Sequence, residues 1–246
     1  MQRICVIGDS HAAALKLGWE TIRAGLPGME LDFYAAPKPH MAAFAAEDGK
    51  LVATSTALRK FLEQTSGGRF SIDGSYDLYL VCGIGAGLEA VAQTVKQLMM
   101  DAAVKGEALA DDQLRRGMAR QMRDVEACVF LEKLRRITEA PIGLIARPLQ
   151  GAGNFANYLR AKGEERRVAE FYADCFDRVV RKQSRARFLS QPLETLGKGP
   201  LSTAEHFFHR PARIAVQGVE NDGNHANGDY GAIVVRSALE RMGALG

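Results

Sequence analysis

Short apolar runs alternate with stretches of helical periodicity along nearly the whole chain, and this alternation limits the folds that the chain can adopt. Four runs have the length and the bounding residues of buried strands: 4–7, 31–35, 78–82 and 142–146. Apolar residues recur at helical spacing around these runs, which predicts helices at 15–22, 56–62, from 88 onward, 114–129, 168–179 and 231–242. Strands that alternate with helices build a parallel sheet covered on both faces. The pattern therefore predicts an α/β fold with a three-layer, doubly wound, mostly parallel sheet.

The length of 246 residues suits one domain of this kind and is ample for a sizeable core. No linker divides the chain, so we expect a single domain over residues 1–246. The longest irregular stretch, 191–211, is either a functional loop or a simple connection. The hydrophobic fraction of 47% and the charged fraction of 25% are typical of a soluble globular protein rather than a disordered or fibrous one.

The charge balance limits the partners that the chain can attract. The formal net charge is +3, which is too small to indicate a nucleic-acid or membrane partner. Basic residues between 178 and 187 recur at helix-face spacing, which indicates a solvated stripe, with attraction of an anionic substrate or partner as the alternative. No apolar stretch has the length of a secretion signal or a membrane span, so a cytoplasmic location is the default expectation. Nothing in the sequence indicates the oligomeric state.

The cysteines and histidines show no metal-binding pattern. The four cysteines are scattered without a Cys-x-x-Cys pair, and Cys5 and Cys82 fall inside predicted strands, so we expect reduced core thiols. The five histidines lack zinc spacing, and we expect neither a metal nor an organic cofactor. His11 and His40 fall near loops at the edge of the predicted sheet, where a pocket-lining or surface role is favoured over metal ligation.

A serine follows the first predicted strand within the turn Gly8-Asp9-Ser10-His11. The chain enters a helix there, which presents the Ser10 hydroxyl at the carboxyl edge of the sheet. Open α/β sheets bind their ligands at that edge. The structural alternative is that Ser10 caps the helix by accepting a hydrogen bond from a free backbone N–H.

A second polar cluster, Asp222-Gly223-Asn224-His225-Ala226-Asn227, precedes the last predicted helix, and we expect it to form a loop. An Asp and a His three residues apart in a loop can fold so that the carboxylate holds one imidazole nitrogen while the other faces a nucleophile. The alternative is an Asx-rich turn with a surface histidine.

A strand-end Gly-Asp-Ser near the N-terminus together with Asp-x-x-His before the last helix resembles the SGNH (GDSL-type) hydrolase family over nearly the whole chain. The resemblance implies a flavodoxin-like SGNH architecture, with Ser10 as the nucleophile, His225 as general base and then acid, and Asp222 as the group that orients the imidazole. It implies hydrolysis of a small or carbohydrate-borne acyl ester through a serine ester. An O-acyltransferase with the same triad and a non-catalytic SGNH-like binding protein are the alternatives.

The sequence departs from the family pattern at the oxyanion hole. Family members use a glycine after the second strand and an asparagine in a Gly-x-Asn turn after the third. Here the loop 37–41 has no glycine, and the turn reads Gly83-Ile84-Gly85, with Gly85 where the asparagine would be. Because losing one such donor costs about 10² to 10³ in rate, either another group substitutes or activity is weak. Asn154 and Asn157 are candidate substitutes, with a Gly/Asn-rich turn of no functional role as the alternative.

The run Gly83-Ile84-Gly85-Ala86-Gly87 follows a strand and opens a helix, as phosphate-binding turns do. The dinucleotide fingerprint requires its third glycine one place later, where Leu88 stands. We therefore favour a small-molecule or saccharide ester as the ligand over a dinucleotide.

Overall fold

The computed structural model describes residues 1–149, 154–209 and 222–245, and its centre is a five-stranded sheet. All neighbouring strands pair in parallel. Their order across the sheet is β2 (Met29–Ala35), β1 (Gln2–Gly8), β6 (Leu78–Cys82), β7 (Ile142–Ile145) and β8 (Arg187–Leu189). Numbered along this sheet alone, the order is 2-1-3-4-5, which is the flavodoxin-like arrangement.

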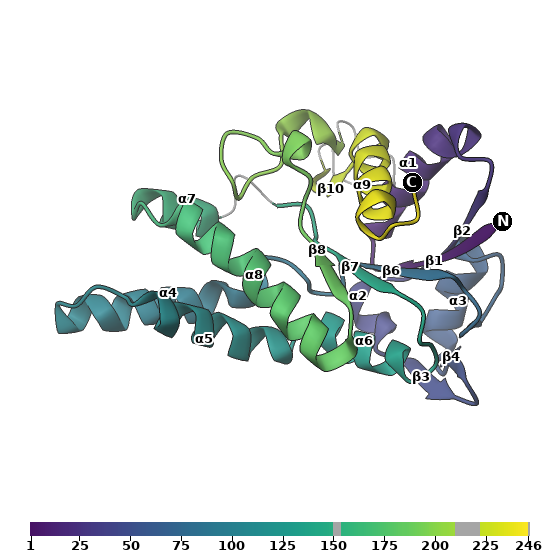
Figure 1. Cartoon of the computed structure of the whole chain (residues 1–246), viewed down its shortest axis with the longest axis horizontal. Coiled ribbons are helices and arrows are strands. Elements are labelled where there is room, and N and C mark those ends of the chain that lie inside the picture. The colour runs from purple at the N-terminus through teal and green to yellow at the C-terminus, as the bar shows by residue number, and fades with distance from the viewer. Residues whose placement is uncertain (150–153, 210–221, 246) are drawn as a thin grey trace.

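Helices cover both faces of the sheet (Figure 1). One face packs against two helices, α1 (Ala12–Ile22) and α9 (Gly228–Arg241). The opposite face packs against α3 (Thr56–Thr65), α4 (Glu89–Lys105), α6 (Glu126–Arg135) and α8 (Glu165–Ser184). The three-layer fold predicted from the sequence is confirmed, and the strand order is the one that the resemblance to SGNH hydrolases implies.

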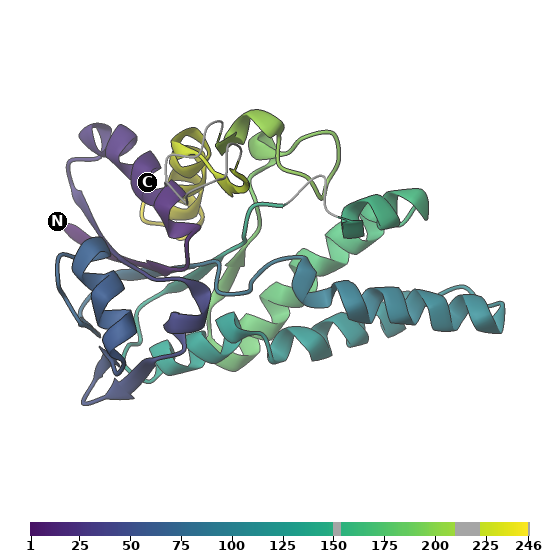
Figure 2. The ribbon, with the colours of Figure 1, turned by 180° about the vertical axis from the view of Figure 1, so that it is seen from behind.

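The remaining elements lie at the periphery. Helix α5 packs against α4 and α8, and these helices extend past the edge of the sheet in both views (Figures 1 and 2). The peripheral helices are α2 (Lys38–Met41), α5 (Asp111–Arg123) and α7 (Asn154–Ala161), with short 3₁₀ turns η1 (Arg23–Gly25), η2 (Leu193–Thr195) and η3 (Glu205–Phe207). The additional strands are β3 (Phe44–Glu47), β4 (Lys50–Ala53), β5 (Ser71–Asp73), β9 (Phe208–His209) and β10 (Asp222–Ala226).

The helix predicted over 114–129 and the loop predicted over 37–40 differ from the structure. The single helix expected over 114–129 is two helices, because Val125 adopts an extended conformation between α5 and α6. Val129, the last member of the predicted apolar stripe, is exposed rather than buried. The proline-rich loop 37–40 contains the start of α2, since proline is tolerated in the first turn of a helix.

All four cysteines are buried and free, as predicted. Burial raises the pKa of the Cys128 thiol to about 12. Within the described ranges, no helix has the length and apolar character needed to cross a membrane.

Helices α1 and α9 touch through their backbones, because glycines stand where they cross. A Cβ atom added at Gly231 would lie 1.7 Å from the carbonyl oxygen of Ala14, and one added at Gly18 would lie 2.0 Å from the backbone nitrogen of Ala232. Any side chain at either position would force the helices apart. The contact therefore sets the distance between the segment that leads into α1 and the segment that leads into α9.

A buried carboxylate anchors β2. Asp32 accepts a hydrogen bond from the Tyr76 hydroxyl at 2.8 Å, and its second oxygen lies 2.8 Å from a guanidinium nitrogen of Arg69. Burial by itself would raise the pKa of Asp32, but the hydrogen bonds from Arg69 and Tyr76 and the Arg3 charge outweigh it and lower that pKa.

We predict that Gly231→Ala destabilises the protein by about 1–3 kcal/mol, because the added methyl group overpacks the α1–α9 contact. The direction of this change in stability is informative, because replacing glycine by alanine within a helix ordinarily stabilises a protein by up to about 1 kcal/mol. Urea unfolding measures the change. Gly25→Ala is the control, because an added Cβ there meets no atom within 4 Å. Equal stability of Gly231→Ala and wild type would contradict the contact.

We predict that Asp32→Asn lowers the free energy of unfolding at neutral pH by about 1–3 kcal/mol through weaker hydrogen bonds. Because the pKa of Asp32 is lower in the folded than in the unfolded chain, the carboxylate stabilises the fold above about pH 4, the pKa of an unfolded aspartate. That contribution is lost as the pH falls through the folded pKa.

The difference in stability between wild type and Asp32→Asn is therefore constant above about pH 5 and shrinks in acid. Chemical denaturation at a series of pH values measures it. Glu30→Gln, at an exposed position of the same strand, is the control and is expected to match wild type. If the difference in stability between wild type and Asp32→Asn grew on acidification, the pKa of Asp32 would be raised by folding rather than lowered, which would contradict the prediction.

Candidate active site

The turn after β1 is held by the buried carboxylate of Asp9. One oxygen of Asp9 accepts the backbone N–H of His11 at 3.1 Å, and the other accepts the backbone N–H of Ile84 at 2.8 Å. Asp9 thus ties the turn after β1 to the turn after β6, its neighbour in the sheet. Ser10, between Asp9 and His11, is exposed at the carboxyl edge of the sheet.

The turn after β6 has an unusual backbone. Gly83, Ile84 and Gly85 have φ angles of +74°, +49° and +82°. A Cβ at Gly83 would lie 2.2 Å from a carboxylate oxygen of Asp9, so a side chain there is excluded. A β-branched residue in the left-handed region costs about 1–3 kcal/mol. Ile84 is held there by burial of its side chain and by the hydrogen bond to Asp9.

His225 lies in a strand rather than in the predicted loop. The prediction that 222–227 forms a loop is wrong, because Asp222–Ala226 form β10, which pairs antiparallel with β9. The following residue, Asn227, caps α9 by accepting the N–H of Tyr230 at 3.1 Å. Its amide also donates to the carbonyl of His206 at 2.8 Å. His225 is therefore held just before a capped helix.

The structure brings Ser10 and His225 together across 215 residues of sequence. The distance between Ser10 Oγ and His225 Nε2 is 2.8 Å. The helix-cap alternative for Ser10 is not adopted, since α1 has His11 at its N-cap and no capping side chain. In enzymes, a nucleophile and its general base lie within about 2.6–3.2 Å of each other. Ser10 Oγ and His225 Nε2 are therefore close enough for a proton to pass from the hydroxyl to the imidazole. The ring of His11 packs beside that of His225, with centroids 5.3 Å apart.

The other predicted site residues fall into two groups. The side chains of Asp222 and Asn154 lie outside the described part of the structure, although their backbones belong to β10 and α7. Asn157 is exposed on α7 and accepts a hydrogen bond from Arg160 at 3.1 Å. His40 packs against Phe61, with ring centroids 5.1 Å apart. Within the described part of the chain, Asn157 and His40 therefore contact Arg160 and Phe61 and not the Ser10–His225 pair.

Gly85 lies beside a charged pair. A Cβ there would lie 2.6 Å from one carboxylate oxygen of Glu126, and the other oxygen of Glu126 is 2.8 Å from the ammonium of Lys38. The hydrogen bond from Lys38 lowers the pKa of Glu126. The Cβ atom of an asparagine at position 85 would thus collide with the Glu126 carboxylate of this ion pair.

Arg147 also lies at the carboxyl edge of the sheet and was not predicted from the sequence. Its Nε donates a hydrogen bond to Nε2 of His11 at 2.9 Å, and its Nη1 lies 4.0 Å from a carboxylate oxygen of Glu89. Arg147 follows β7 by two residues, as Ser10 follows β1. The rule that ligands bind at the carboxyl edge of the sheet, applied to every strand end, would have found it.

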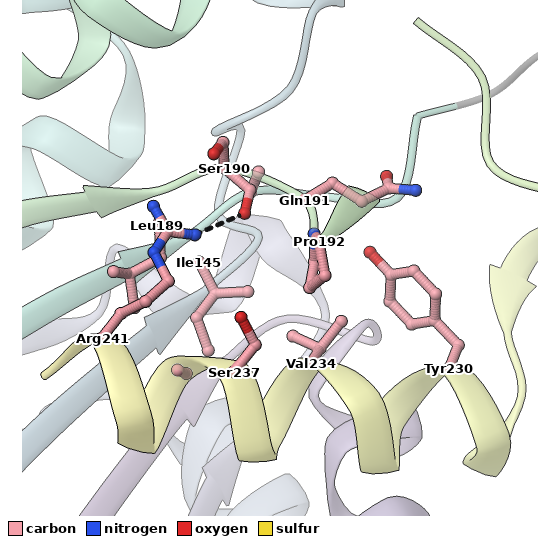
Figure 3. Close-up of a pocket in the computed structure, with 11 residues that line it drawn as sticks. Ile145, Leu189, Ser190, Gln191, Pro192, Tyr230, Val234, Ser237 and Arg241 are labelled. Atoms are coloured by element: carbon pink, nitrogen blue, oxygen red, sulfur yellow. Dashed lines mark hydrogen bonds between the residues drawn. The ribbon is translucent and has the colours of Figure 1, made fainter. Parts of the chain in front are cut away.

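A small pocket opens between α9 and the carboxyl ends of β7 and β8 (Figure 3). The buried Tyr230 hydroxyl lines it and has no hydrogen-bond partner among the described residues. Burial raises the pKa of Tyr230. The lining contains neither Ser10 nor His225, so the pocket is separate from this pair. The residues that the structure describes include no group of three His, Cys, Asp or Glu side chains placed to hold a metal ion.

Comparison with known proteins finds no matching family model and no matching curated protein. Among solved structures, the chain is similar to a lipase from a goat rumen metagenome, with 9% identity, a TM-score of 0.45, and 99% of this chain and 98% of that chain covered. It is also similar to the periplasmic domain of a lipopolysaccharide acetyltransferase from Salmonella ser. Paratyphi A, with 9% identity, a TM-score of 0.42, and 99% and 84% covered.

A third similar structure is a carbohydrate acetylesterase family member from Sinorhizobium meliloti, with 11% identity, a TM-score of 0.40, and 100% of both chains covered. Because the identities are this low and every TM-score is below 0.5, none of these likenesses assigns an activity to the present chain.

We predict that Asp9→Asn lowers the free energy of unfolding by about 1–3 kcal/mol. An amide offers one acceptor oxygen where the carboxylate uses two, so a buried backbone N–H of either His11 or Ile84 loses its partner. Urea unfolding measures the loss. Asp101→Asn is the control, because this exposed residue accepts a single bond from Gln97 that an amide oxygen can also accept. Indistinguishable stabilities of the two variants would contradict the bridging role of Asp9.

Proposed function

We propose that the protein is a serine ester hydrolase that acts on short acyl esters of small alcohols or saccharides. The observation that supports this best is the 2.8 Å separation between Ser10 Oγ and His225 Nε2. The exposure of Ser10 at the carboxyl edge of the sheet also supports it, since the carbonyl carbon of an ester can approach there even when the alcohol is bulky.

In the proposed reaction, the hydroxyl proton of Ser10 passes to Nε2 of His225 as Oγ bonds to the carbonyl carbon of the ester. For Nε2 to accept this proton, the neutral imidazole has to carry its own proton on Nδ1. The bond to the leaving alcohol then breaks, and the alcohol takes the proton from His225. Water, activated by the same imidazole, releases the acid from the serine ester and restores both groups.

We assign Asp222 as the group that orients the imidazole of His225. The two residues are three apart in β10, and regular strand geometry would put them on opposite faces. The pairing of β10 with β9 shifts register between Asp222 and Ala226, which interrupts that alternation. A strand with such a register shift is therefore compatible with a carboxylate and an imidazole on the same side.

We predict that the purified protein releases p-nitrophenol from p-nitrophenyl acetate and that Ser10→Ala abolishes this release. A fluorophosphonate probe is expected to label Ser10 in the wild type, with the labelled residue identified by peptide mass spectrometry. Ser55→Ala is the matched control, since Ser55 caps α3 by accepting the N–H of Leu58 at 3.2 Å. Its loss costs about 1 kcal/mol of stability without removing a nucleophile, so turnover should remain.

Equal turnover by wild type and Ser10→Ala, or no labelling of Ser10 by the probe, would exclude the proposal. Product analysis with an added sugar separates hydrolysis from transfer. Free acid as the sole product is the expected result, and an acylated sugar would identify the chain as an O-acyltransferase.

A further inference from the structure

The turn next to Ser10 offers no polar side chain to the proposed reaction. Gly83 and Gly85 have none, and the apolar side chain of Ile84 is buried. Attack on an ester moves negative charge onto the carbonyl oxygen, and one well-placed donor to that oxygen contributes about 10² to 10³ in rate. On the function proposed above, a side-chain donor has to come from another element.

Arg147 reaches this turn from the neighbouring strand. Its backbone N–H donates to the carbonyl of Ala86 at 3.1 Å, which ties the segment after β7 to the turn after β6. A Cβ at Gly87 would lie 3.3 Å from Cδ of Arg147 and 2.1 Å from a carboxylate oxygen of Glu89. The lack of a side chain at Gly87 thus leaves room for the arginine stem to cross toward the end of β1.

The guanidinium of Arg147 is held one side chain away from the Ser10–His225 pair. Its Nε donates to His11, whose ring packs beside the ring of His225. In a guanidinium, Nε and one N–H of Nη2 lie along the same edge. The edge that faces His11 therefore carries a second donor, for which no bond is recorded among the described residues.

The charge of Arg147 is only partly offset. The nearest recorded carboxylate oxygen, on Glu89, is 4.0 Å from Nη1, which is longer than a hydrogen bond. The Arg147 side chain is 25% exposed, so its field is less screened by water than that of a surface arginine.

We propose that Arg147 is the side-chain donor to the oxyanion in the reaction at Ser10, and that His11 holds its guanidinium in place. As the bond between Ser10 Oγ and the carbonyl carbon forms, the carbonyl electron pair moves to the oxygen, which accepts an N–H from Nη2. When the bond to the leaving alcohol breaks, the pair returns to the carbonyl and the contact weakens.

The test compares Arg147→Gln and Arg147→Lys with wild type, using p-nitrophenyl acetate and the fluorophosphonate probe. Arg147→Gln is expected to lower kcat and the rate of Ser10 labelling by about 10²-fold, with little change in KM, because the lost interaction forms only in the transition state. Arg147→Lys should recover part of the loss, since it keeps the charge but not the planar edge.

Arg178→Gln is the matched control, because Arg178 is an exposed arginine that pairs with Asp174 on α8, away from the sheet edge. It is expected to retain wild-type kcat. Urea unfolding of each variant identifies any loss that comes from misfolding, and Arg147→Lys, which keeps a cation on a long stem, provides a second substitution if Arg147→Gln fails to fold.

A second experiment separates a direct contact of Arg147 with the oxyanion from an effect of Arg147 that passes through His11. His11→Phe keeps a ring beside His225 but removes the acceptor for Arg147. If Arg147 contacts the oxyanion itself, His11→Phe lowers kcat less than Arg147→Gln does, because the guanidinium is still present although it is held less firmly. If Arg147 acts only by positioning His11, removing His11 costs at least as much as removing Arg147. A loss in His11→Phe equal to or larger than that in Arg147→Gln would therefore overturn the assignment and make Arg147 a positioning residue.

The outcomes distinguish this inference from the function on which it rests. If the probe does not label Ser10 of the wild type, the hydrolase proposal fails and the role of Arg147 fails with it. If wild type is labelled and active while Arg147→Gln matches it within about twofold, only the oxyanion role is overturned. A rise in KM at constant kcat also overturns that role, because it indicates ground-state binding of substrate.

Discussion

The backbone contact between α1 and α9 is the constraint on which the arrangement of the sheet edge depends. Gly18 and Gly231 allow the two helices to approach until main-chain atoms touch. Since α1 starts two residues after Ser10 and α9 starts three residues after His225, a small change in the helix crossing would be passed directly to both. A hydrogen bond of 2.8 Å tolerates little such movement. Tight packing between the two helices thus sets the separation between Ser10 and His225.

Sequence periodicity was sufficient for β1, β2, β6 and β7 of the sheet and for its two helical layers, because buried strands and amphipathic helices produce strong local signals. Periodicity did not predict the elements whose conformation depends on tertiary contacts. Strand β8 has three residues, and the strands β3, β4 and β5 have three or four, too few for a period to emerge. The break at Val125 falls within a stripe that continues on both sides of it, so helical spacing alone could not locate it.

The proposed nucleophile and base were identified from the sequence because Ser10 and His225 belong to motifs with a recognisable order. Arg147 belongs to no motif, and its importance arises from a contact with His11 across 136 residues. The asparagines predicted as substitutes for the missing amide, Asn154 and Asn157, follow β7, as Arg147 does, whereas the donor that we propose is the cation of Arg147. Side chains from separate strand ends meet only in three dimensions, which explains why spacing along the chain could not reveal this one.

The sequence distance between Ser10 and His225 also bears on how the chain is made. Strands β1, β2 and β6 are neighbours in the sheet and precede β10 in the chain, so the turn that holds the serine is synthesised long before its partner. The partner arrives only when β10 and α9 are in place, 215 residues later. On the proposed function, a partly synthesised chain would hold a serine of ordinary reactivity. Docking of α9 against α1 would then bring the base to the nucleophile and activate it.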